Sequence, residues 1–337
     1  MFIKAYICVG MINKMIYEEI SFLLFLALLS ISRSFGENHQ TDCPMLWKVS
    51  KKGLAHDSFL FGTCHTGVHD YTIGELYEIF PRLKHIMKDV DCVMTEINHN
   101  LKDSLVIAEC VKAAEIGMAA YLPNALNSMP DTITFESLYD DTNMAKEVDQ
   151  FLVEEYNVYN YKDRKPAFWW SRLRHFFYND KFVPGKNVDD CIYEEALRFN
   201  KKYVVLETIY EQRKDVVNSD TLYLAYPLRK QANMLYDEIL NIKNDSMRKD
   251  GRGFRLMLDS MYRLNNFCNI EQKLQGRGGM GENENLVVVR NKKWLPKIIK
   301  NITLNSCLVS FGLAHLGGQA GLIELLRKEG YVLTPII

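Results

Sequence analysis

The sequence has no excess of charge of either sign, since 41 lysine and arginine residues face 42 aspartate and glutamate residues and the formal net charge is −1. Non-specific binding to nucleic acid needs a basic surface, so no nucleic-acid partner is expected. The spacings G-x-S-x-G, H-E-x-x-H and G-K-S/T do not occur. A nucleophile elbow, a helical zinc motif and a phosphate-binding loop are therefore excluded.

The eight cysteines include no C-x-x-C pair. If Cys8 is removed with a leader peptide, seven remain (8 − 1), and an odd number leaves at least one thiol free or joined to another chain. Cys64, Cys92 and Cys307 lie within or beside strand-like apolar runs. This placement favours buried thiols over a disulfide framework.

Long apolar runs are missing except near the N-terminus, where Ile20–Ile31 is almost continuously apolar and follows two lysines. Ser34 and Gly36 supply small residues for a cleavage site, and the run is shorter than the ~20 residues that span a bilayer. We predict that residues 1–36 are a secretory signal, so that the mature protein is secreted or periplasmic and has no stable membrane span. The alternative is a buried or membrane-anchoring helix, which would keep an uncleaved chain at the membrane.

Two apolar runs at opposite ends of the chain finish in the same way. One leads into Gly62-Thr63-Cys64-His65 and the other into Gly312-Leu313-Ala314-His315. Each pattern predicts a buried strand that ends at a glycine and presents a histidine three residues later. The alternative is that His65 and His315 are hydrogen-bonded residues at strand ends with no ligand.

Two further strand-like runs, Cys92–Thr95 and Tyr203–Leu206, are followed by the carboxylates Glu96 and Glu207. If these strands and the two that precede the histidines lie parallel in one sheet, all four polar groups fall at its carboxyl edge, where open α/β sheets bind ligands. Imidazole and carboxylate groups together are typical ligands of a divalent metal ion. The alternative is that each carboxylate caps the helix that follows it.

The order of elements predicts an α/β domain over 44–337 with a mixed, largely parallel sheet flanked by helices. A hairpin is expected over 46–61, and helices over 73–90, 101–118 and 319–329. The helix over 319–329 separates two strands, so we expect those strands to form a parallel pair through a right-handed crossover.

The middle of the chain, about 119–200, is expected to be a helical insertion over the pocket. Its aromatic cluster around Phe168-Trp169-Trp170 is expected to be core packing, with the wall of a peptide or ligand groove as the alternative.

Several ordered segments of the chain, from about residue 46 to the end, resemble the TraB/GumN/TIKI family. They are Leu46-Trp47-Lys48-Val49, Phe59–His65, Val204–Thr208 with Glu211-Gln212, Val289-Arg290-Asn291 with Trp294, and Phe311–Gly318 with Leu325–Tyr331. The resemblance implies a metal-dependent hydrolase fold related to the erythromycin-esterase and ChaN-like proteins. TIKI members are metalloproteases that trim secreted signalling proteins, and TraB and PrgY members limit peptide-pheromone activity.

The resemblance also implies roles for particular residues. His65 and His315 would bind one divalent ion, Mn²⁺ or Co²⁺ by analogy with the family, and Glu96 would ligate it or act as a base. Arg290 would steady the developing oxyanion or a substrate carboxylate, and Glu207 would be a further site residue. The expected substrate is a peptide or protein. The alternatives are a metal-free esterase-type hydrolase with a histidine base, and a non-catalytic protein that binds a peptide or another ligand.

Overall fold

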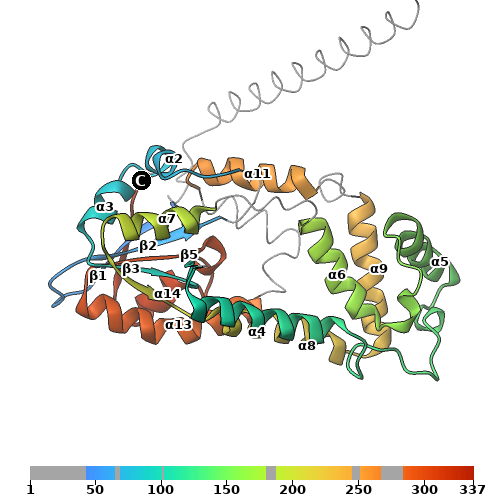
Figure 1. Ribbon diagram of the computed structural model, residues 1–337. Coiled ribbons are helices and arrows are strands. Elements are labelled where there is room, and N and C mark those ends of the chain that lie inside the picture. Colours follow the sequence, from blue (N-terminus) through green and yellow to red (C-terminus); the bar gives the residue numbers. More distant parts are fainter. Residues whose placement is uncertain (1–42, 65–68, 101, 180–186, 245–250, 267–283) are drawn as a thin grey trace, which may run out of the picture. The chain divides into compact units, whose positions relative to one another are not determined.

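The sheet of the computed structural model is mixed and mostly parallel, as predicted (Figure 1). In the described part of the chain it has six strands in the order β4-β3-β5-β2-β1-β6. The strands are β1 (Leu46–Ser50), β2 (Ser58–Thr63), β3 (Cys92–Thr95), β4 (Lys202–Val205), β5 (Cys307–Gly312) and β6 (Val332–Pro335). β4, β3, β5 and β2 run parallel, whereas β1 is antiparallel to both of its neighbours. The structure describes residues 43–64, 69–100, 102–179, 187–244, 251–266 and 284–337, so the predicted signal lies outside it.

The described residues also form eleven α-helices. They are α2 (Ile73–Ile79), α3 (Leu83–Asp89), α4 (Ser104–Tyr121), α5 (Thr142–Gln150), α6 (Pro166–Asn179), α7 (Val188–Arg198), α8 (Ile209–Leu222), α9 (Leu228–Asn244), α11 (Gly251–Arg263), α13 (Glu284–Leu304) and α14 (Leu322–Lys328). Five single-turn segments join them, namely η1 (Glu136–Leu138), η2 (Phe151–Glu155), η3 (Tyr161–Asp163), η4 (Tyr223–Ala225) and η5 (Leu313–His315). Figure 1 shows α2, α3 and α7 on one face of the sheet and α13 and α14 on the other.

The predicted hairpin is confirmed, but two other predictions are wrong. β6 does not pair with β5, because the hairpin strands β2 and β1 lie between them in the sheet. It pairs antiparallel with β1 instead. The helix predicted over 73–90 is two helices, which end and begin on either side of Pro81. Proline has no N–H and disfavours helical geometry at the residue before it, here Phe80, so the apolar spacing continues through a break in the backbone.

Three helices that start next to the sheet are fixed by reciprocal side-chain caps. Thr72, Asn187 and Thr208 each accept a hydrogen bond from the backbone of a residue three positions on, whose own carboxylate accepts from the cap residue. Such boxes satisfy backbone donors that a helix start leaves unpaired. Thr208 directly follows Glu207, so the cap of α8 fixes the turn on which that glutamate lies.

The apolar side chains of the described residues form two clusters. The larger surrounds the sheet and includes α7, and the smaller is built from the helices and turns between η1 and α6 together with α9. Trp169, Trp170 and Leu173 are buried in the smaller cluster, which confirms core packing for these residues. Phe168 is half-buried and lines a small pocket between α4, α6 and α8. The prediction that the helical segment covers the site stays a prediction.

The glycine of the first G-x-x-H segment is required by a close contact with the second segment. A Cβ added at Gly62 would lie 3.3 Å from the Cα of Leu313 and 2.5 Å from Cδ1 of Leu316. Tyr262 also donates a hydrogen bond to the Gly62 carbonyl oxygen at 3.0 Å. The two segments therefore pack against each other, and any larger side chain at Gly62 must displace the start of η5.

We expect Gly62→Ala to lower the free energy of unfolding by about 1–3 kcal/mol, because it overpacks this contact. Gly74→Ala is the matched control: Gly74 lies inside α2, where alanine is the better helix former, and its added Cβ would come no closer than 3.8 Å to Thr72. Urea unfolding of both variants measures the difference. Equal stability of Gly62→Ala and the unmodified protein would contradict the contact.

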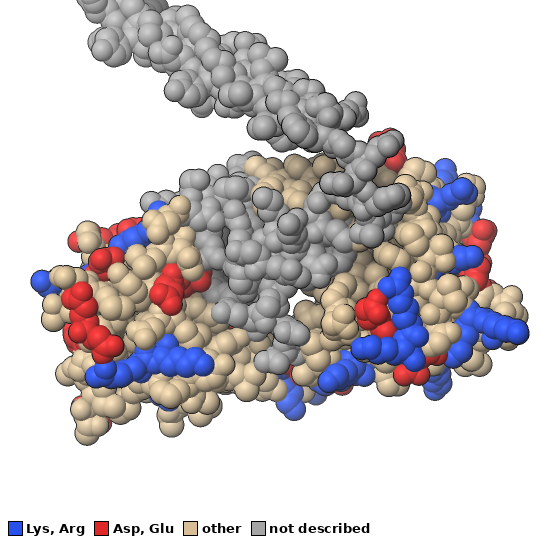
Figure 2. All heavy atoms as spheres, turned by 180° about the vertical axis from the view of Figure 1, so that it is seen from behind, with Lys and Arg blue, Asp and Glu red and all other residues tan. Residues whose placement is uncertain are grey.

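The described surface mixes charges of both signs. Figure 2 shows acidic and basic side chains interspersed on the described parts of one face. Among the residues that the structure describes, no helix has the length and the apolar composition to cross a membrane.

Candidate active site

A buried guanidinium lies at the carboxyl edge of the sheet between two carboxylates. Arg290, from α13, donates from Nε and Nη2 to Glu207 Oε1 at 3.0 and 2.6 Å and from Nη2 to Glu96 Oε2 at 2.5 Å. The Arg290 side chain is only 8% exposed. Burial alone would lower the pKa of Arg290, but the charges and hydrogen bonds of Glu96 and Glu207 raise it above its usual value. The guanidinium is therefore held charged at a fixed place.

Glu96 connects four elements of the site. It directly follows β3, and its Oε1 accepts a hydrogen bond from the backbone N–H of Gly312, at the end of β5, at 2.6 Å. Its Oε2 accepts from Gln212 on α8 at 3.1 Å in addition to Arg290. Since both oxygens are held, the carboxylate has one orientation, and it faces the segment that carries the second histidine.

Glu207 is more deeply buried than Glu96 and is held by two neighbours on α13. Besides Arg290, Trp294 donates from its indole nitrogen to Glu207 Oε2 at 3.1 Å. Desolvation raises the pKa of Glu207 above its ordinary value, although the hydrogen bonds and charge of Arg290 oppose that shift. The carboxylate is thus stabilised in the fold mainly by the guanidinium beside it.

His315 has its ring orientation set by Asn291. Nδ1 of His315 lies 2.6 Å from Oδ1 of Asn291, whose amide nitrogen donates to Ala320 O at 2.8 Å. The amide oxygen can only accept, so Nδ1 carries a proton, and Arg290 Nη1 can only donate, so Nε2 accepts with its lone pair. The ring also lies against Trp294, with centroids 4.4 Å apart. Nε2 faces Arg290 Nη1 at 3.1 Å and Glu96 Oε1 at 3.8 Å.

The geometry of His315 and Glu96 fits the first ligands of a metal ion. Two ligand atoms that share one ion at about 2.1 Å each lie no more than about 4.2 Å apart, and the separation of 3.8 Å satisfies this limit. A hydrogen bond from Nδ1 to an oxygen, here that of Asn291, is the usual outer support of a ligating histidine. Within the described ranges, no group of three or more histidine, cysteine, aspartate or glutamate side chains lies together so that it could hold a metal ion.

His65 lies outside the described residues, so its place beside His315 stays a prediction. The chain that leads to it is well anchored. Thr63 is in register with Gly312 on the neighbouring strand, and its hydroxyl donates to Asp189 Oδ1 at 3.1 Å. The strand that precedes His65 therefore ends at the same edge of the sheet as the strand that precedes His315.

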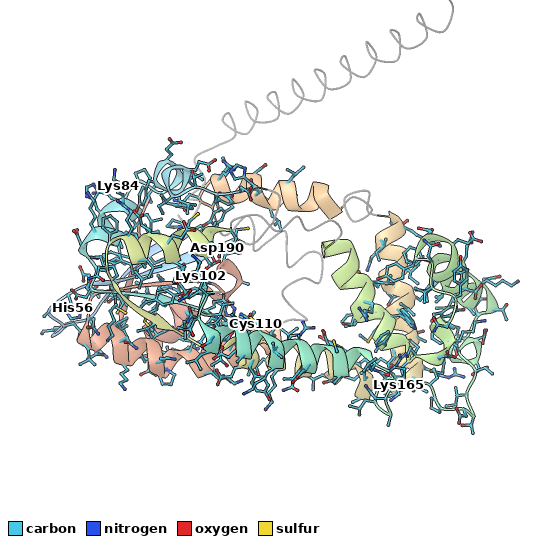
Figure 3. The ribbon with its side chains drawn as sticks, in the orientation of Figure 1. His56, Lys84, Lys102, Cys110, Lys165 and Asp190 are labelled. Carbon is cyan, nitrogen blue, oxygen red and sulfur yellow. The ribbon has the colours of Figure 1, made fainter. Side chains whose placement is uncertain are left out.

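A second imidazole lies beyond Glu96 on the same loop. Nδ1 of His99 lies 2.9 Å from Oδ1 of Asp190, which Figure 3 labels at the start of α7. Burial lowers the pKa of His99, but the hydrogen bond to Asp190 and the charges of Asp189, Asp190 and Glu96 outweigh it and raise the pKa. Its role is to hold the Glu96 loop against α7.

The structure thus brings together Glu96, Glu207, Arg290 and His315, four of the five predicted site residues. It adds Asn291 and Trp294, to which sequence reasoning gave no role. The sequence held a signal for Trp294 alone: it follows Arg290 by four residues in a helix, a spacing that places the two on the same helix face.

The fold and this cluster define an α/β protein whose sheet edge holds a buried arginine–carboxylate–histidine network. Residues 45–335 match the model of the TraB/PrgY/gumN family, so the chain belongs to this family. This confirms the resemblance seen in the sequence segments. No curated protein and no solved structure matches the chain.

Proposed function

We propose that the protein is a metal-dependent hydrolase that cleaves peptide or protein substrates outside the cytoplasm. The observation that supports it most is the separation of 3.8 Å between His315 Nε2 and Glu96 Oε1, a distance suited to two ligands of one ion. In this proposal His65 is the third ligand. The export part of the proposal is supported by Cys43, which is disulfide-bonded, since disulfides persist in oxidising compartments.

Each residue of the cluster has a distinct part in the proposed reaction. A divalent ion such as Mn²⁺ or Co²⁺, held by His65, His315 and Glu96, would supply an acidified water molecule and a Lewis acid. Arg290 provides a fixed positive charge for the negative charge that develops on the substrate oxygen. Glu207 acts through Arg290: by accepting from both Nε and Nη2, it sets the plane of the guanidinium.

The test is the digestion of a mixture of unstructured peptides by the purified mature chain, followed by mass spectrometry. We expect cleavage that chelation abolishes and added Mn²⁺ or Co²⁺ restores. Glu96→Gln should cleave at least ~100-fold more slowly, because it removes a ligand charge at the reacting centre. Glu324→Gln, which alters an ion pair with Arg327 on α14, is the matched control and should leave the rate unchanged. Undiminished cleavage by Glu96→Gln would contradict the proposed role.

One observation favours a second candidate, a metal-free hydrolase in which His315 is the general base. Arg290 Nη1 lies 3.1 Å from His315 Nε2, so the guanidinium already faces the lone pair that a metal would use. In that case the unmodified protein would still cleave the peptides after exhaustive chelation. The His315→Ala variant would not cleave them, with or without a chelator.

A further inference from the structure

Two buried cysteines face each other in the sheet, away from the candidate site. Cys92 is the first residue of β3 and Cys307 is the first residue of β5. The two are register partners in the parallel pair, and both are fully buried as reduced thiols. Glu96 and Gly312 lie at the other ends of these two strands, so the cysteines and the site occupy opposite edges of the sheet.

The backbone geometry at this pair meets the requirement for a disulfide. Register partners on neighbouring strands project to the same face, and the strands are about 4.8 Å apart. A disulfide needs Cα atoms about 4.4–6.8 Å apart. Each thiol donates to a backbone oxygen, Cys92 Sγ to Val93 O at 3.8 Å and Cys307 Sγ to Asn305 O at 3.4 Å. Because the register already sets the strand spacing that a disulfide needs, closing the bond requires the two side chains to turn rather than the strands to move.

We propose that Cys92 and Cys307 form a cross-strand disulfide when the chain folds in the presence of a disulfide oxidant such as oxidised glutathione. The inference is independent of the proposed hydrolase activity. Because both sulfurs are buried in the finished sheet, the reaction belongs to the folding chain, before β3 and β5 close.

The reaction balances as two thiol–disulfide exchanges. The Cys92 thiolate attacks one sulfur of oxidised glutathione, which forms a mixed disulfide and releases one glutathione thiolate. When β5 docks in register, the Cys307 thiolate attacks the Cys92 sulfur and expels the second glutathione. Two electrons pass from the cysteines to the oxidant, and the two thiol protons end on the two released glutathione molecules, which leave as thiols.

The disulfide would covalently link β3, which leads to Glu96, with β5, which leads to His315. The bond closes a long loop between Cys92 and Cys307, and such loops constrain the unfolded chain strongly. Oxidation would therefore stabilise the register on which the site depends, without touching a site residue.

The test starts from reduced, unfolded mature chain, which is refolded with and without glutathione disulfide and then digested without reduction. Mass spectrometry should find the Cys92 and Cys307 peptides joined only after oxidative refolding. The oxidised protein should melt about 5–10 °C above the reduced one. Cys92→Ala and Cys307→Ala should each lose most of this rise, whereas Cys110→Ala, on α4 (labelled in Figure 3), should keep it. A Cys43 disulfide adds the same rise to all four proteins, so the difference between the rise of the unmodified protein and the rise of Cys92→Ala or Cys307→Ala measures the Cys92–Cys307 bond.

The peptide analysis needs no variant, so it decides the matter even if an alanine variant does not fold. If Cys92 and Cys307 of the oxidatively refolded protein both react with an alkylating reagent after denaturation, while Cys43 does not, the inference is overturned. A rise in melting temperature that persists unchanged in Cys92→Ala would also overturn it.

Discussion

Arg290→Met is expected to lower the free energy of unfolding by about 3–5 kcal/mol at pH 8, the cost of leaving a buried charge without its partner. The guanidinium bonds to both Glu96 and Glu207, and the Glu207 side chain is only 4% exposed. Methionine fills part of the same volume, so the loss reports charge more than cavity. Urea unfolding of the variant and of the unmodified protein measures it.

The loss should depend on pH in a defined direction. A carboxyl whose pKa is raised on folding gives stability that is complete below its unfolded-state pKa and is lost as the pH rises through its folded-state pKa. Glu207 has a raised pKa even with Arg290 present, and removal of the guanidinium raises it further. The cost of Arg290→Met should therefore be smallest near pH 4, where Glu207 is protonated, and should grow toward pH 8.

Lys293→Met on the same helix is the matched control. Lys293 pairs with Asp215 at 2.5 Å, but its side chain is 53% exposed, so its loss should cost no more than about 1 kcal/mol and show no comparable growth with pH. An Arg290→Met variant that loses as little as Lys293→Met, or that loses the same amount at pH 4 and pH 8, would contradict a network held by a buried charge.

The positions of Glu96, Glu207 and the His315 segment were predictable because a simple rule governs them. A short apolar run that ends in a polar residue predicts a buried strand, and parallel strands deliver their ends to one edge. The rule needs no knowledge of strand order. The rule therefore placed these residues correctly, although the strand order β4-β3-β5-β2-β1-β6 could not be predicted from the sequence.

The centre of the network was not predictable from the same rule. Arg290 lies in a helix, and its approach to Glu207 depends on how α13 packs against the sheet, which is a tertiary contact. Only the family resemblance placed it near the site. Asn291 shows the same limit, since an asparagine in a polar helix gives no sign that it fixes a histidine tautomer through a bond of 2.6 Å.

The two wrong elements have local and topological causes. The apolar spacing over 73–90 continues through Pro81, so the spacing alone predicted one helix where the proline separates two. The last strand follows a strand–helix–strand pattern that favours adjacency, yet the edge of β1 was open and β6 paired there. Both errors leave the site untouched, because neither element carries one of its residues.

His65→Ala and His315→Ala are each expected to abolish metal binding. Nε2 of His315 is the only imidazole lone pair that the described residues bring within 4 Å of Glu96, and His65 supplies the second imidazole of the proposed site. Loss of one ligand of three should weaken binding at least ~100-fold, more than the 10- to 100-fold typical of outer-shell changes. His315→Ala also leaves Asn291 Oδ1 without its donor, so urea unfolding must first show that this variant folds.

The decisive measurement is a titration of the metal-free protein and its variants with Co²⁺, followed by visible absorption and by calorimetry. The unmodified protein and His85→Ala, which changes an exposed residue of α3, should each bind one ion with the same affinity. His65→Ala and His315→Ala should both fail to bind at the same concentrations. Tight binding by a folded His65→Ala variant would show that imidazoles from the two ends of the chain do not share an ion, and would contradict the proposed metal site.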